Sequence, residues 1–109
     1  MGFRPGNEHG TSNGATDQTI VSAPPANITR IVKSMYIHNA DTVAAVLNVF
    51  FDDGGTERKL YEVSLNADET WEWEGIIVLD ETDQLLEINL DGAVTTNELD
   101  FLCSYGDYF

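Results

Sequence analysis

Residues 43–65 read VAAVLNVFFDDGGTERKLYEVSL: an apolar run, a turn cluster and an alternating run. In residues 43–51 apolar side chains recur at every second position, the period at which they share one face of a β-strand. The turn cluster at 52–55 favours a tight reversal, because aspartate and glycine tolerate positive φ angles. The stretch therefore predicts a long antiparallel hairpin at the centre of an all-β domain.

Further short runs of alternating or apolar residues follow one another along the chain, separated by turn residues. They lie at 19–23, 28–38, 69–74, 76–79, 84–90 and 98–105. About eight short strands without an amphipathic helix pattern predict a compact antiparallel β-sandwich or jelly roll. We assign this domain to residues 19–109, with 76–79 as a short buried strand and Cys103 as a buried structural thiol.

The N-terminal segment differs in composition from the rest of the chain. Residues 1–18 read MGFRPGNEHGTSNGATDQ, with four glycines and almost no apolar side chains beyond Met1 and Phe3. Such a segment buries too little to offset the entropy lost on ordering, so we expect a flexible, extended arm. It is either a passive terminus or a docking arm that becomes ordered on a neighbour, with Phe3 and Arg4 as anchors.

The charge balance excludes some classes of partner. Five basic residues against nineteen acidic ones give a formal net charge of −14. A surface of this sign repels phosphate, so we expect neither nucleic-acid nor anionic-membrane binding. The charge provides solubility, or it keeps apart many copies displayed on one surface, or it docks onto a basic partner.

Few residues could support catalysis or hold a metal. The chain has two histidines, His9 and His38, and one cysteine, Cys103. One histidine in the folded domain cannot supply a cupin-type metal centre or a zinc site, and no nucleophile motif is present. We therefore expect no enzyme activity, no cofactor and no essential metal. The acidic turns at 52–53 and 80–83 could hold calcium, but neither matches an EF-hand loop.

Two tryptophans stand at positions i and i+2 of a predicted strand. Trp71 and Trp73 share one face of the run ETWEWE at 69–74. Their large apolar area favours burial in the core or at an interface between subunits. The alternative is an exposed platform on which sugar rings stack.

Residues 20–73 have a characteristic order of strands and turns. They read IVSAPPANITRIVKSMYIHNADTVAAVLNVFFDDGGTERKLYEVSLNADETWEW. The segment opens on Ala-Pro, has a strand ending in His-Asn-Ala-Asp and a strand ending before a glycine turn, and leads through Glu-Thr to Trp. This order resembles that of small bacteriophage virion proteins, the head-decoration, neck and tail accessory proteins built on a compact β-sandwich.

The resemblance implies a non-enzymatic structural role, with no catalytic residues to carry over. It implies a capsid decoration (cement) protein that binds and stabilises the major capsid protein lattice, or another virion protein, as a homo-oligomer, with a trimer favoured. Its place would be the virion, assembled in the host cytoplasm. The alternatives are a phage neck, head-tail connector or tail protein, or a carbohydrate-binding module. The candidate partner-binding residues are Phe3, Arg4, Trp71 and Trp73.

Overall fold

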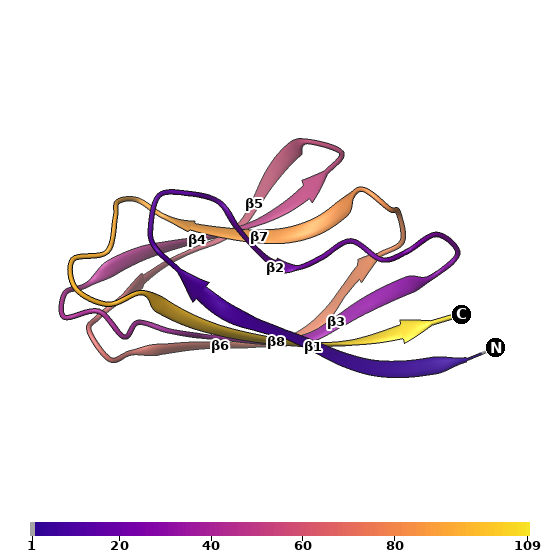
Figure 1. The fold of residues 1–109 in the computed structure, drawn as a ribbon, viewed down its shortest axis with the longest axis horizontal. Helices are drawn as coiled ribbons and strands as arrows, with labels where there is room; N and C mark the ends of the chain where they lie inside the picture. The colour runs from indigo at the N-terminus through magenta and orange to yellow at the C-terminus, as the bar shows by residue number, and fades with distance from the viewer. Residues whose placement is uncertain (1) are drawn as a thin grey trace.

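The computed structural model describes residues 2–109; Met1 lies outside the described residues. These residues form eight β-strands and no helix (Figure 1). The strands are β1 (Phe3–Ser12), β2 (Gln18–Val21), β3 (Thr29–His38), β4 (Ala45–Asp53), β5 (Thr56–Leu65), β6 (Thr70–Leu79), β7 (Gln84–Leu90) and β8 (Leu99–Tyr108). The prediction of an all-β domain is confirmed.

The strands form two four-stranded antiparallel sheets that pack face to face. One has the order β1-β8-β3-β6, here called the first sheet, and the other has the order β2-β7-β4-β5, the second sheet. Figure 1 shows the two layers, with the first sheet below. Strand β1 pairs with β8, β2 with β7, β3 with β6 and β4 with β5, all antiparallel. This nested pairing of first with last strand is the arrangement of a jelly-roll sandwich.

The hairpin predicted from residues 43–65 is present as β4 and β5. Its turn uses Gly54 and Gly55 at φ angles of 61° and 95°, and the Asp52 carboxylate accepts a hydrogen bond from the Gly55 N–H at 2.8 Å. The hairpin is not central in its sheet, because β5 is an edge strand. Of its two strands, β4 is an inner strand that pairs with β7 as well as with β5.

The core lies between the two sheets and is built from the inward-facing side chains of β2, β3, β4, β7 and β8. Fully buried members include Ile20, Val32, Met35, Ile37, Leu47, Val49, Leu86, Ile88, Leu99 and Cys103. Burial raises the pKa of the Cys103 thiol to about 12, so the thiol is held in its inert form. The prediction of a buried structural cysteine is confirmed.

The expectation of a free N-terminal arm over residues 1–18 is wrong for the residues of β1. Phe3–Ser12 pairs with β8 along its whole length and forms an edge of the first sheet. Gly6 lies opposite Tyr105 and Gly10 opposite Phe101, and a Cβ added at Gly6 would lie 2.6 Å from the Tyr105 ring. The apolar cover of this strand therefore comes from aromatic rings of β8 lying over its glycines, a contribution that the composition of β1 does not show.

One further expectation needs correction at strand β6. The runs 69–74 and 76–79 form one strand, which has a bulge near Gly75 where it pairs with β3. The end of this strand is not buried as predicted: Ile76 is 71% exposed and Val78 is 45% exposed. Only Ile77 and Leu79 turn inward, because neighbouring side chains of a strand point to opposite faces.

Candidate functional site

The four predicted partner-binding residues do not form one site. Phe3 and Arg4 lie on β1, and Trp71 and Trp73 lie on β6, which are the two opposite edges of the first sheet. Each pair therefore has to be considered with its own surroundings.

Phe3 and Arg4 belong to a cluster at the end of the sandwich where both chain termini lie (Figure 1). Phe3 is 56% exposed and its ring lies 5.0 Å from the Tyr108 ring. Phe109 is 52% exposed, and the Arg4 guanidinium lies 5.4 Å from its ring centroid. We call Phe3, Arg4, Tyr108 and Phe109 the aromatic end. Sequence reasoning missed Tyr108 and Phe109, because only strand pairing brings the two termini together.

A buried ion pair lies behind the aromatic end. The Arg30 guanidinium donates to both carboxylate oxygens of Asp107, at 2.8 and 3.1 Å, and also to the Ser22 carbonyl at 2.8 Å. It lies 4.2 Å from the Tyr105 ring centroid. The hydrogen bond to Asp107 raises the pKa of Arg30, so the guanidinium stays charged. These contacts fix β3 against β8 next to the aromatic end.

The two tryptophans lie between β5, an edge strand of the second sheet, and β6, an edge strand of the first sheet. Both are half-buried and pack against the core. The Trp73 indole N–H donates to the Tyr61 hydroxyl at 2.9 Å, and the Tyr61 ring lies 5.3 Å from the Trp71 ring at an angle of 55°. Because their inner faces contact the core and a tilted tyrosine bridges them, the geometry favours packing over a flat sugar platform.

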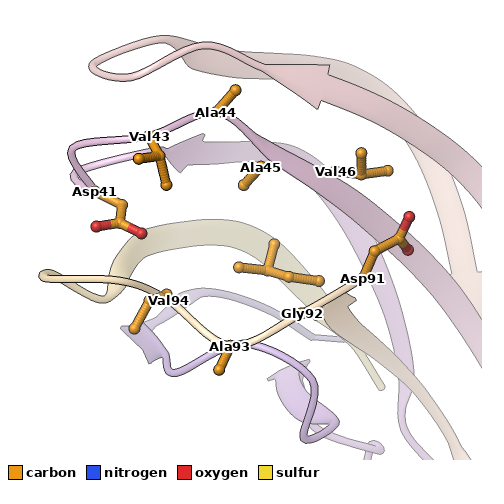
Figure 2. Close-up of a pocket in the computed structure, with 10 residues that line it drawn as sticks. Asp41, Val43, Ala44, Ala45, Val46, Asp91, Gly92, Ala93 and Val94 are labelled. Atoms are coloured by element: carbon orange, nitrogen blue, oxygen red, sulfur yellow. The ribbon is translucent and has the colours of Figure 1, made fainter.

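A pocket of about 230 Å³ lies between the start of β4 and the loop that joins β7 to β8 (Figure 2). Small apolar residues line most of it, together with Asp41 and Asp91. The Asp41 carboxylate accepts hydrogen bonds from the backbone N–H groups of Thr42, Thr95, Thr96 and Asn97, at 2.8 to 3.2 Å. These bonds, led by the one from Thr95, lower the pKa of Asp41 to about 2. Asp41 thus holds the β7–β8 loop in place, and both of its carboxylate oxygens already accept hydrogen bonds from backbone N–H groups.

The outward side of the second sheet is acidic. Asp17, Glu57 and Glu87 bring carboxylate oxygens within 4.8 Å of one another, the one group in the described residues placed to share a cation. Partial burial, followed by the hydrogen bond and charge of Asp52, raises the pKa of Glu87 to about 7. The pKa of Glu57 is raised too, first by its hydrogen bond with Asp17. The acidic turn at 52–53 therefore contributes Asp52 to a larger cluster, a grouping that sequence spacing does not show.

The residues considered for catalysis are dispersed. The His38 Nδ1 lies 2.7 Å from the Thr70 hydroxyl, and the His9 Nδ1 lies 3.4 Å from the Asn7 side-chain oxygen. Within residues 2–109, no hydrogen bond joins Cys103 to either histidine. The described residues also contain no helix long and apolar enough to cross a membrane.

The outward side of the first sheet carries exposed apolar residues. Ile76, Val78 and Leu102, each at least 42% exposed, lie on it and were not predicted as binding residues, and the predicted Phe3 lies at its edge. No other segment of the described chain covers this side (Figure 1). We call it the outer face of the first sheet.

No protein-family model matches the sequence, and no curated protein matches it. Solved structures do match the fold. A chain from the disulfide-linked pili described as Bacillus endospore appendages aligns with a TM-score of 0.58 at 16% identity, over 97% of this chain and 85% of that chain. A chain of the T13 particle of infectious bursal disease virus aligns with a TM-score of 0.59 at 15% identity, over 96% of this chain and 30% of that chain. A chain of the cyanophage Pam1 capsid asymmetric unit aligns with a TM-score of 0.51 at 15% identity, over 98% and 84%.

At these identities the likeness is one of fold. The chain has a β-sandwich fold that is also found in viral capsid chains and in a pilus chain.

Proposed function

We propose that this chain is a non-enzymatic structural protein of a virion, a decoration (cement) protein that attaches to the capsid lattice of a phage through its aromatic end. The observation that carries the proposal is the pair of half-exposed phenylalanines, Phe3 and Phe109, at the end where both termini meet. The fold shared with capsid chains supports the same role.

The aromatic end has the composition of a binding hot spot. Aromatic and arginine side chains dominate the energetics of protein interfaces, because rings bury a large area at little cost in conformational entropy and a guanidinium both donates hydrogen bonds and stacks on rings. Arg4 is one of only five basic residues in a chain of net charge −14, and it lies beside an exposed ring. The buried Arg30–Asp107 pair behind it joins the backbones of β3 and β8 before binding, so less backbone entropy is lost on attachment.

The acidic outward side of the second sheet fits a subunit displayed in many copies. Attachment by one end leaves this side in solvent, where like charges keep neighbouring copies apart and the particle soluble. A protein that binds only the assembled lattice stabilises it by mass action, and many weak sites add up through avidity. The partner would be the major capsid protein or another virion protein.

The rival roles differ in which surface they use. A phage neck, head-tail connector or tail position would use the same aromatic end on a different virion protein. A carbohydrate-binding module would need the indole faces of Trp71 and Trp73, which pack against the core and Tyr61. A disulfide-linked pilus would need an accessible thiol, whereas the single cysteine, Cys103, is fully buried.

The test is binding to particles isolated from the source of the sequence. Intact protein should sediment with the particles in many copies and raise the temperature at which they break open. The variant Phe3→Ser/Phe109→Ser should bind at least about tenfold more weakly, because hot-spot truncations cost more than about 1–2 kcal/mol each. Leu60→Ser, at an exposed apolar residue of β5, is the matched control and should bind normally. Full binding by the double variant, or absence of the intact protein from particles, would overturn the proposal.

A further inference from the structure

The outer face of the first sheet is organised in four rows that run straight across the strands in the order β1, β8, β3, β6. Strand pairing fixes each row. The rows are Pro5–Gly106–Ile31–Val78, Asn7–Ser104–Ser34–Glu74, His9–Leu102–Tyr36–Glu72 and Thr11–Asp100–His38–Thr70. Ile76 projects between the first and second rows, at the bulge opposite Lys33.

This face carries few carboxylates for so acidic a chain. Its rows contain Glu72, Glu74 and Asp100 together with the imidazoles of His9 and His38, and Lys33 lies beside the rows at the bulge. In a chain with nineteen acidic residues, a surface that combines few carboxylates with exposed Ile76, Val78 and Leu102 points to a protein partner.

The rows are also self-complementary: each fits the same row of a second copy laid over it with the strand order reversed. Reversing the third row places His9 on Glu72 and Leu102 on Tyr36. Reversing the fourth row places Asp100 on His38, and reversing the first places Pro5 on Val78. These three reversals set an imidazole against a carboxylate or an apolar group against an apolar group, and the second row sets polar groups against polar groups, Asn7 on Glu74 and Ser104 on Ser34.

We propose that the outer face of the first sheet binds the same face of a second copy, with a two-fold axis parallel to the strands and between β8 and β3. This symmetry produces the reversal, because it lays β1 of one copy over β6 of the other and β8 over β3. The imidazoles of His9 and His38 then donate hydrogen bonds to Glu72 and Asp100 of the partner copy. Isologous contacts of this kind are the commonest route to dimers of soluble proteins.

A two-fold axis running across the strands fits less well. It would lay each strand on its own counterpart, so the apolar first row would face the polar fourth row. Pro5 would then lie near Thr11, and Val78 near Thr70. The charge and apolar pattern therefore selects the axis parallel to the strands.

The area is sufficient for a specific pair. Four strands span about 19 Å across the sheet, and the residues from Phe3 to Thr11 span about 27 Å along it. Two faces of this size bury about 1,000 Å² or more in total, the lower bound for a biological interface. Aligned sheets pack in this way in β-sandwiches, at about 30° to each other.

The pair also has a consequence for attachment. An axis parallel to the strands leaves both aromatic ends at the same end of the dimer, so two copies could contact one lattice together. Only this consequence rests on the proposed function; the pairing itself does not depend on capsid binding. The proposed oligomer is a pair, whereas the resemblance implied a trimer.

Cross-linking by a short bismaleimide tests the arrangement. Stacked sheets lie about 10 Å apart, which is too far for a direct disulfide but within reach of such a linker. His9→Cys and Glu72→Cys lie on opposite edge strands, about 14 Å apart across the sheet of one copy, and the proposed axis sets each over the other in the pair. A mixture of the two single variants should therefore form a cross-linked heterodimer, and each variant alone should not. The buried Cys103 should not compete. Equal cross-linking of either variant with itself, or no cross-linking in the mixture, would overturn the proposed axis.

Sedimentation of the whole protein tests the surface itself. At 0.15 M salt, which screens the net charge, the intact chain should sediment as a dimer at micromolar concentration. Leu102→Lys should raise the dissociation constant at least about tenfold, because it buries an unpaired charge at the centre of the face. Leu60→Lys, at a residue of similar exposure on β5, should leave it unchanged. An intact chain that stays monomeric at 100 times these concentrations, or equal effects of the two variants, would refute the proposal whether or not the chain binds capsids.

Discussion

Replacing Glu87 by glutamine should stabilise the fold at neutral and alkaline pH. The pKa of Glu87 is raised from 4.5 to about 7, first by partial burial and then by Asp52. Without screening by solvent, such a pKa shift corresponds to about 3 kcal/mol of destabilisation of the folded state above pH 7. The side chain is only partly buried and water screens the cluster, so about 1–2 kcal/mol is the expected gain.

The pH dependence distinguishes this effect from a general change of charge. Below about pH 4.5 the carboxyl is protonated in both the folded and the unfolded chain, so the substitution should have little effect. Between pH 4.5 and 7 the unfolded chain releases the proton while the folded chain retains it, so the intact protein loses stability as the pH rises.

Thermal unfolding followed by circular dichroism, with EDTA present, measures the difference. Glu87→Gln should unfold about 5–10 °C above the intact protein at pH 8 and close to it at pH 4. Glu81→Gln, an exposed carboxyl in the β6–β7 turn, makes the same change of charge and is the control. Equal gains from the two variants at pH 8 would show that Glu87 is not strained by its surroundings, and would refute the reasoning.

Asp41→Asn should destabilise the fold at pH 6. The intact protein should lose stability as the pH falls from about 4 to 2, because the Asp41 carboxylate becomes protonated, and the variant should not show this loss in an acid titration of unfolding. Gly14→Ala should cost at least about 2 kcal/mol in urea unfolding, because Gly14 has a φ of 128° and a Cβ there would lie 2.5 Å from the Ala93 Cα; a neutral result would contradict the close approach. Arg30→Met should cost about 3 kcal/mol, because it leaves a buried carboxylate unpaired; an unchanged urea midpoint would argue against the ion pair. The fluorescence of Trp71 and Trp73 together should be only partly quenched by acrylamide and unaffected by soluble oligosaccharides; protection by a glycan would favour the carbohydrate-binding alternative.

The strands with clear alternation could be predicted from the sequence. In β7 the buried residues Leu86, Ile88 and Leu90 stand at every second position, and its bounds were predicted correctly. The hairpin of β4 and β5 was predicted because its glycine turn lies between two such runs. In these elements the signal is local, since each strand carries its own apolar face.

The elements that were missed depend on residues far apart in the sequence. Strand β1 carries no apolar alternation, and its glycines are covered by Phe101 and Tyr105 of β8. In hindsight, glycines at every fourth position of β1 and aromatic residues at every fourth position of β8 are a pairing signal. The run at 76–79 looks buried from its composition, but only the sheet topology shows that one of its faces is left uncovered.

The candidate sites were predicted in part. Phe3 and Arg4 were selected for their residue types, whereas their neighbours Tyr108 and Phe109 required the pairing of β1 with β8. The role of Asp41 depends on backbone groups more than fifty residues away, which no local pattern shows.

Cryo-electron microscopy of particles from the source of this sequence tests the central claim most directly. The account predicts β-sandwich density of this fold on the outside of the shell, with the end bearing Phe3 and Phe109 against the lattice and the acidic side of the second sheet facing solvent. Particles without such density, although the chain is present in the same cells, would contradict it.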